Sequence, residues 1–184
     1  DLNDFMNRCR ALSQEEIAQL AELGALAALQ PKPSRRDAMW QVSKWEKQSE
    51  LSLRENDQED PSPLRDMSQM EEIQADLSGS GLTVGPHPLA LVRKELDSFG
   101  ALRIDELAKR TPRSHARVAG LSIIRQRPPT AKGFLFVTLE DESGLLNVIV
   151  SPQLLAEQRS VIYGTRNLVI DGVIEKNGDA VQLR

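Results

Sequence analysis

The order of elements in residues 113–184 restricts the fold of this chain more than any other feature. Three β-type runs come first, at 116–126, 134–141 and 144–150, and two more follow at 166–178 and 180–184. A helical run at 151–162 separates the two groups, with Ser151 as its N-cap and Pro152 in its first turn. A simple meander of strands has no reason to place a capped helix there. The order predicts a five-stranded Greek-key barrel, the OB-fold.

The second of these strands alternates strictly, and its two sides differ in character. Leu135, Val137 and Leu139 form an aliphatic side, which we expect to face the barrel interior. Phe134 and Phe136 then lie on the outer side. Oligonucleotides lie across the second and third strands of this fold, so both rings are candidates for base stacking. The alternative is that either ring packs beneath the helix or against the preceding part of the chain.

Two loops of the predicted barrel carry cations. The loop after the first strand, "RQRPPTAKG", contains Arg125, Arg127 and Lys132, and Lys176 precedes the Asn-Gly turn between the last two strands. Basic groups that guide a phosphate backbone, next to aromatic rings that stack bases, are typical of single-strand binding. We therefore predict a nucleic-acid site formed by Arg125, Arg127, Lys132, Phe134, Phe136 and Lys176.

The rest of the chain divides into three parts, which makes the whole an α+β protein. Residues 1–45 form a helical, helix-hairpin-helix-like region, in which Ser13 and Glu16 match a capping box. Residues 46–62 are polar and aperiodic and are predicted to be a flexible acidic linker. Residues 63–112 form a helical connector, and 113–184 form the OB domain.

Charge is distributed unevenly along these parts. Residues 46–76 hold 10 acidic and 3 basic side chains, whereas residues 113–184 hold 7 acidic and 9 basic ones. The acidic middle would repel a nucleic acid, and the C-terminal part can accept one.

Gly24, in "LAELGAL", allows two interpretations. Two short helices that meet at a glycine can form a hairpin that offers backbone N–H groups to a phosphate. The plainer interpretation, which we favour, is a glycine C-cap between packed helices.

No set of residues points to catalysis or to a metal. His87 stands alone between two prolines, which favours a structural role, and the acids Glu140–Glu142 sit at a hairpin turn where solvation explains them. The single cysteine, Cys9, excludes a disulfide framework and fits a reducing cytoplasm. We expect neither a signal peptide nor a membrane span. Because the first residue is Asp1 and the last run is a strand, we interpret the chain as a piece of a longer protein.

Several stretches resemble a known family. "RRDAMWQV", "GLTVGPHPLALVR" and "VAGLSIIRQRPPTAKGFLFVTLEDESGLLNVIV" are similar to the C-terminal region of bacterial C-family DNA polymerases. The combination of "GPHPLAL", "RQRPPTAKG" and "TLEDESG" resembles the error-prone ImuC branch, which is related to the polymerase III alpha subunit. The resemblance covers residues 1–30, 34–45 and 63–184 and is most specific in about the last hundred.

The resemblance implies a function for the parent protein that these residues do not perform alone. It implies tandem helix-hairpin-helix motifs, then an OB domain, and a catalytic palm that uses Mg²⁺ and lies far upstream. This piece would then bind single-stranded template DNA during damage-induced translesion synthesis, without a catalytic residue or cofactor of its own. The alternative is a protein-interaction module that docks the polymerase onto partners. The resemblance also implies three partners: the mutagenesis proteins ImuA and ImuB, and the sliding clamp.

One short pattern in the linker fits the clamp. "QSELSL", with Gln48, Leu51 and Leu53, is similar to the Q-x-x-L-x-L/F peptides that bind bacterial sliding clamps. A flexible tether could present these side chains to pockets on the clamp. The alternative is a linker with two incidental leucines, since six-residue patterns this loose arise by chance.

Overall fold

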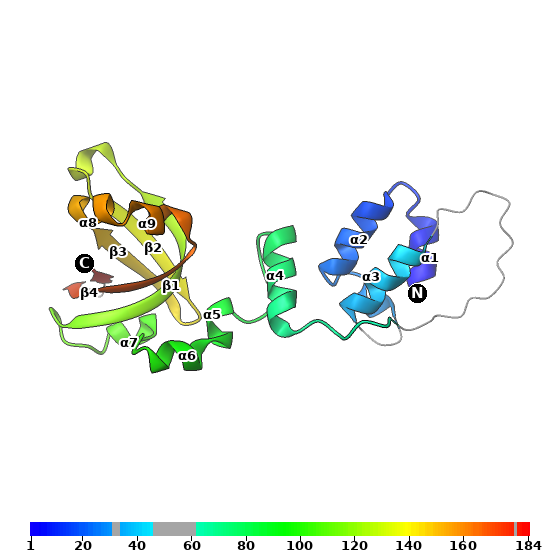
Figure 1. The fold of residues 1–184 in the computed structure, drawn as a ribbon, viewed down its shortest axis with the longest axis horizontal. Coiled ribbons are helices and arrows are strands. Elements are labelled where there is room, and N and C mark those ends of the chain that lie inside the picture. The colour runs from blue at the N-terminus through cyan, green and yellow to red at the C-terminus, as the bar shows by residue number, and fades with distance from the viewer. Residues whose placement is uncertain (31–33, 46–61, 179) are drawn as a thin grey trace, which may run out of the picture. The chain divides into compact units, whose positions relative to one another are not determined.

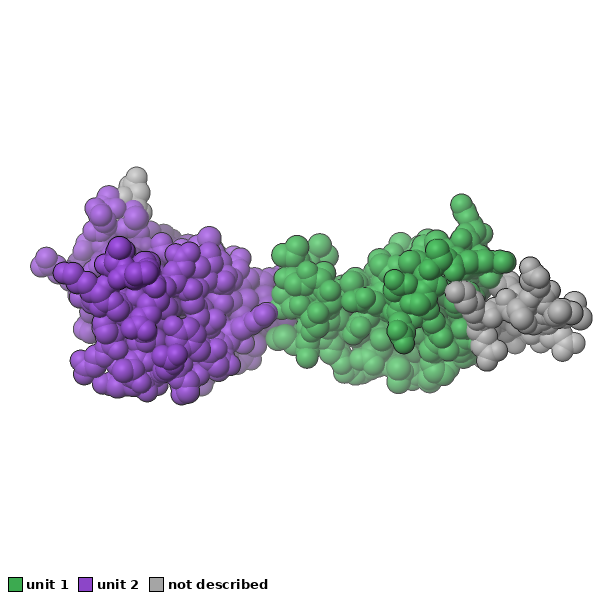
Figure 2. All heavy atoms as spheres, turned by 90° about the horizontal axis from the view of Figure 1, so that it is seen from above, with its two compact units in different colours: residues 1–85 green, residues 86–184 purple. Residues whose placement is uncertain are grey.

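The structure, a computed structural model, describes residues 1–30, 34–45, 62–178 and 180–184. Within them the chain forms two compact units, residues 1–85 and 86–184, which Figure 2 shows in different colours. The boundary falls inside the predicted connector, so that its first part belongs to unit 1 and its second part to unit 2. The predicted linker lies outside the described residues except for Ser62, and so does the candidate clamp motif of Gln48, Leu51 and Leu53.

Unit 1 is helical (Figure 1). Its helices are α1 (Leu2–Arg8), α2 (Gln14–Glu22), the 3₁₀ turn η1 (Ala27–Leu29), α3 (Arg35–Lys44) and α4 (Gln69–Gly79). The capping box predicted at Ser13 is present at the start of α2, and Ser68 begins α4 in the same way. The first three helices and η1 enclose a small core of Leu2, Met6, Ile17, Ala21, Leu26, Ala38 and Val42.

Gly24 ends α2 as a C-cap. Its φ is +82°, in the left-handed region that glycine adopts at low cost. The N–H of Gly24 donates to the carbonyl of Ala21, and the N–H of Ala25 donates to that of Leu20, both at 3.0 Å. This is the pairing of a Schellman motif. The amides of Gly24 and Ala25 are therefore engaged within the helix end, as the C-cap interpretation predicts.

A buried ion pair attaches α4 to α3. Arg35 Nη1 lies 2.6 Å from Asp76 Oδ1, and the two side chains are only 13% and 8% exposed. Thr83 donates to the other oxygen of Asp76 at 2.8 Å. The hydrogen bond from Arg35 outweighs burial and lowers the pKa of Asp76. Asp76 is thus held as a carboxylate that links α4 to α3 through Arg35, 41 positions away in the sequence.

Unit 2 is a closed barrel, as predicted. Its strands are β1 (His115–Gln126), β2 (Leu135–Asp141), β3 (Gly144–Val150), β4 (Asn167–Asn177) and β5 (Ala180–Leu183), in the order β1-β2-β3-β5-β4. Two short helices, α8 (Pro152–Glu157) and α9 (Arg159–Gly164), occupy the β3–β4 connection, with Ser151 as the N-cap of α8. This topology confirms the α+β class and the OB-fold.

The first strand closes the barrel by changing partners along its length. His115–Leu121 pair with β4, and Leu121–Gln126 pair with β2. Gly120 lies at this change. A Cβ atom there would stand 2.7 Å from the Cβ of Leu139 on β2, closer than two carbon atoms approach. Glycine is required at this position because any side chain would overlap Leu139 where β1 and β2 meet.

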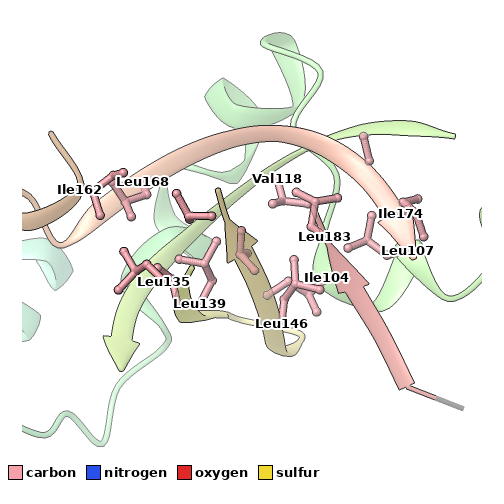
Figure 3. Packing of buried hydrophobic residues seen from close by; sticks show 14 of the residues in the cluster. Ile104, Leu107, Val118, Leu135, Leu139, Leu146, Ile162, Leu168, Ile174 and Leu183 are labelled. Carbon is pink, nitrogen blue, oxygen red and sulfur yellow. The ribbon is translucent and has the colours of Figure 1, made fainter. Parts of the chain in front are cut away.

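The barrel interior is filled by aliphatic side chains that also come from the helices. Figure 3 shows Ile162 of α9 beside Leu168 at one end, and Leu107 beside Ile174 at the other. Leu107 belongs to α7 (Ile104–Leu107), which follows α5 (Pro88–Leu91) and α6 (Arg93–Ser98). Helices from two parts of the chain therefore close the two ends. His87 caps α5, since its Nδ1 accepts the N–H of Leu89 at 3.2 Å, which is a structural role.

Candidate nucleic-acid interface

The outer side of β2 and β3 carries an exposed aromatic ring. Leu135, Val137 and Leu139 are at most 1% exposed, whereas Phe136 is 37% exposed, so the two sides of β2 are as the sequence predicts. In the register of the barrel, Phe136 is flanked by Gln126 on β1 and Ile149 on β3. The ring therefore lies between an amide and an aliphatic side chain, on a surface that a flat base could cover.

A polar row lies next to this ring. Thr138 pairs with Asn147 across β2 and β3, and their side-chain oxygens Oγ1 and Oδ1 are 3.2 Å apart. Asn147 in turn pairs with Gln182 on β5. Amide and hydroxyl groups both donate and accept, so this row can form hydrogen bonds with the edges of bases that stack nearby.

The β1–β2 loop presents the predicted cations Arg127 and Lys132 to solvent. After the 3₁₀ turn η2 (Pro129–Ala131), Lys132 and Gly133 are both left-handed, with φ of +48° and +86°. A Cβ on Gly133 would lie 3.4 Å from Cγ of Pro152, so the loop packs closely against the start of α8. Lys132 therefore lies in a loop that is held against α8, immediately before the start of β2.

Two other predicted cations are engaged by backbone carbonyls. A bulge between Ser122 and Ile124 shifts the register of β1, and Arg125 Nη2 then donates to the carbonyl of Thr165 at 2.5 Å. Its Nε is buried and has no hydrogen-bond partner among the described residues. Lys176 Nζ donates to the carbonyl of Ala108 at 2.6 Å, at the α7 end of the barrel. Lys132, Phe134 and Phe136 thus lie within five consecutive residues at the start of β2, whereas Lys176 lies at the α7 end of the barrel.

The last residue of the chain joins the site, and the sequence prediction did not include it. The guanidinium carbon of Arg184 lies 5.8 Å from the centre of the Phe134 ring. Leu183 is fully buried, so strand alternation directs Arg184 outward together with Gln182. That alternation in "AVQLR" is visible in the sequence, but the proximity to Phe134 depends on the parallel pairing of β3 with β5.

The acidic β2–β3 turn is not solvated, and the sequence interpretation of it was wrong. Asp141 is 3% exposed and accepts the N–H groups of Ile104, Ser143 and Gly144 at 2.9, 2.7 and 3.1 Å. Glu142 pairs with Arg93 of α6. Asp141 accepts from Ile104 of α7, and Glu142 accepts from Arg93 of α6. The two acids therefore attach the helical segment before β1 to the barrel.

Among residues 1–30, 34–45, 62–178 and 180–184, no group of three or more His, Cys, Asp or Glu side chains could hold a metal ion. None of the helices in this described part of the chain has the length and apolar character of a membrane span.

These features define an OB-fold protein with a helical N-terminal unit and an aromatic face beside a basic loop. No family model matches the chain. Three curated relatives, however, share its sequence over nearly all of its length, and all three are named error-prone DNA polymerase. They are from Azoarcus sp. (strain BH72), Anaeromyxobacter sp. (strain K) and Rhodopirellula baltica, and are 40%, 38% and 34% identical over 100%, 98% and 100% of this chain.

The chain is therefore homologous to one part of the bacterial error-prone DNA polymerases, as its motifs predict. It spans only 17%, 16% and 16% of the length of these three relatives. Among solved structures, asparaginyl-tRNA synthetase from Pyrococcus horikoshii aligns with 46% of this chain and 20% of its own, at 12% identity and a TM-score of 0.38. That likeness is too small to bear on function, and the barrel is defined by its own strand order.

Proposed function

We propose that this chain is a non-catalytic C-terminal region of an error-prone translesion DNA polymerase and that it binds single-stranded template DNA on the outer face of β2 and β3. The observation that supports this most is the exposed ring of Phe136, which lies between Gln126 and Ile149 with the polar Thr138–Asn147 row beside it. A base that stacks on the ring would have hydrogen-bonding groups at its edge.

The cations of the β1–β2 loop supply the electrostatic part of the site. Arg127 and Lys132 are exposed at the end of the face where β2 begins, so they can contact the phosphates on either side of a stacked base. Arg125 and Lys176 contribute less, because each would first have to release a backbone carbonyl. The number of phosphate contacts is therefore small, and stacking carries a large share of the affinity.

A salt titration of oligonucleotide binding tests this proposal. The 184-residue chain is mixed with a fluorescently labelled oligo(dT), and the anisotropy gives the affinity at several salt concentrations. Each phosphate contact to a single strand contributes a slope of about −0.7 in the plot of log affinity against log salt. Two or three contacts predict a slope of about −1.4 to −2. No binding at low salt would contradict the proposal.

The second candidate function is docking of a protein partner on the same barrel. Its support is the aliphatic character of the exposed surface around the site, where Ile123, Ile124 and Leu145 are 46%, 45% and 62% exposed. Contiguous exposed apolar surface is a mark of protein–protein interaction sites. The mutagenesis proteins ImuA and ImuB are the partners to test, and binding of either without DNA would favour this function.

The finer proposals concern the parent protein. Its Mg²⁺-dependent nucleotidyl transfer would take place in a palm domain outside this chain, in response to DNA damage. The sliding clamp would bind Gln48, Leu51 and Leu53. A peptide of residues 44–58 should then bind the clamp with a Kd in the micromolar range or weaker, and lose binding with Gln48→Ala and Leu51→Ala together. Equal signal from both peptides would leave clamp recruitment to another protein.

A further inference from the structure

Arg184 is anchored in the sheet and faces the proposed site. Its backbone N–H donates to the carbonyl of Val173 at 2.9 Å, and its carbonyl accepts the N–H of Val173 at 2.6 Å. This pair of hydrogen bonds holds the Cα of Arg184 at the end of β5. Because β5 lies beside β3, the side chain starts from the strand next to the one that carries Ile149.

The guanidinium of Arg184 is placed over an aromatic ring and is only weakly paired. It stands 5.8 Å from the centre of the Phe134 ring. Its acidic neighbour is Glu175, with 3.5 Å between Nη1 and Oε1, and the two side chains are 58% and 36% exposed. An exposed pair at this distance is screened by water and salt, so it competes poorly with a phosphate. The second oxygen of Glu175 already accepts the amide of Gln182 at 2.9 Å.

Phe134 has different surroundings from Phe136. Phe136 has an exposed ring in the middle of the face, whereas Phe134 is half-buried and has the guanidinium over it. Lys132 is exposed and precedes Phe134 by two residues, whereas Arg184, which lies over the ring, is 50 positions after Phe134 in the sequence. A guanidinium held over a ring keeps its N–H groups at its edge, where they can reach an anion.

We propose that Arg184 contacts a phosphate of the bound single strand and that Phe134 positions its guanidinium rather than stacking a base. The proposal rests on the proposed function, and it extends the site from the β1–β2 loop to the end of β5. The stacking then belongs to Phe136. The sugar-phosphate backbone of the DNA then passes the start of β2 between Lys132 and Arg184, so it has a cation on each side.

The experiment compares salt slopes for Arg184→Gln, Phe134→Leu and the double variant in the 184-residue chain. Arg184→Gln should flatten the slope by about 0.7, which at 0.1 M salt is about a fivefold loss of affinity. Phe134→Leu should change the slope in the same direction, with no further effect in the Arg184→Gln background. Phe134→Tyr, which keeps the ring, should restore the wild-type slope.

The chain supplies a matched control. Arg159 lies over the ring of Tyr163, at 5.5 Å, in the same kind of contact but on α9 in the β3–β4 connection and not on a strand. Arg159→Gln and Tyr163→Leu should leave the slope unchanged.

The outcomes separate this inference from the proposed function. A wild-type slope in Arg184→Gln, with binding still weakened by Phe136→Ala, overturns only the role of Arg184. Additive losses from Phe134→Leu and Arg184→Gln overturn the positioning role, because they mean that Phe134 acts on its own. Absence of binding by the unsubstituted chain overturns the proposed function and this inference with it. A measurement without DNA adds a direct check, since the Nε–H resonance of Arg184 should lose its ring-current shift in Phe134→Leu.

Discussion

Arg93 on α6 and Glu142 in the β2–β3 turn form a two-pronged salt bridge, with Nε to Oε1 at 2.6 Å and Nη2 to Oε2 at 2.8 Å. The two side chains are 13% and 16% exposed. Burial is the largest single influence on the pKa of Glu142 and raises it, but the hydrogen bonds from Arg93, a backbone hydrogen bond and the charge of Arg93 together outweigh burial and hold the pKa below the usual 4.5. The pair holds α6, in the segment before β1, against the β2–β3 hairpin that carries the proposed site.

Glu142→Gln should therefore lower the free energy of unfolding of unit 2 by about 1–3 kcal/mol at pH 7, because the closest charged partner of Arg93 becomes neutral. Arg93 then keeps only its longer contacts with Asp141 and Asp97, at 3.6 and 4.0 Å. Since the folded pKa of Glu142 is lowered, this stabilisation is present above pH 4.5 and is lost as the pH falls through the folded pKa. Thermal melting followed by circular dichroism should give a lower Tm for Glu142→Gln than for the unsubstituted chain at pH 7, and this difference in Tm should narrow below pH 4. The control is Asp171→Asn, which removes the charge of an exposed pair with Arg117 and should change the stability little, since water and salt screen that pair. A difference in Tm that is independent of pH would contradict this account.

Gly120→Ala should destabilise the barrel by about 1–3 kcal/mol, because the new methyl group would overlap Leu139 where β1 and β2 meet. Gly164→Ala is the matched control, since a Cβ there would have nothing within 4 Å and its φ is not left-handed. Urea unfolding of the two variants measures the difference. Equal midpoints would mean that β1 can move away from β2 at no cost.

Asp76→Asn should lower the stability of unit 1 by about 1–3 kcal/mol, because it weakens the buried pair with Arg35 that holds α4 against α3. Both tryptophans of the chain, Trp40 and Trp45, are in unit 1, so their fluorescence reports the melting of this unit alone. The barrel transition, followed by far-ultraviolet circular dichroism, should not shift. An unchanged fluorescence transition would show that α4 is held by other contacts.

Phe136→Ala should reduce the affinity for single-stranded DNA by about 1–3 kcal/mol, the usual value for one base stacked on an aromatic ring. The salt slope should stay as it is, because no charge is removed. Phe99→Ala is the control: this ring is 68% exposed and belongs to the segment next to Arg117 on the β1–β4 side. If Phe136→Ala unfolds the domain without a separate effect on binding, the ring serves the core and not the ligand.

Local signals made the predicted elements recognisable. The capping box at Ser13 and the Ser151 cap depend on residues three positions apart, so their hydrogen bonds form in any fold that keeps the helix. The alternation of β2 is local in the same sense, and it correctly assigned Leu135 to the core and Phe136 to the surface. The OB order followed because a capped helix between the third and fourth strands leaves few topologies open.

Which residues belong to the site could be decided only from the tertiary structure. Arg125 looked like a phosphate contact, but a one-residue bulge in β1 directs its guanidinium to the carbonyl of Thr165, 40 positions away. Lys176 is similarly bound to Ala108 and Glu142 to Arg93, while Arg184 reaches Phe134 only because β5 lies beside β3. By itself, therefore, the sequence determined which residues alternate, cap and turn, since those interactions act over a few positions. The tertiary structure decided which charges meet a partner, because strand register and barrel closure set the distances between groups far apart in the chain.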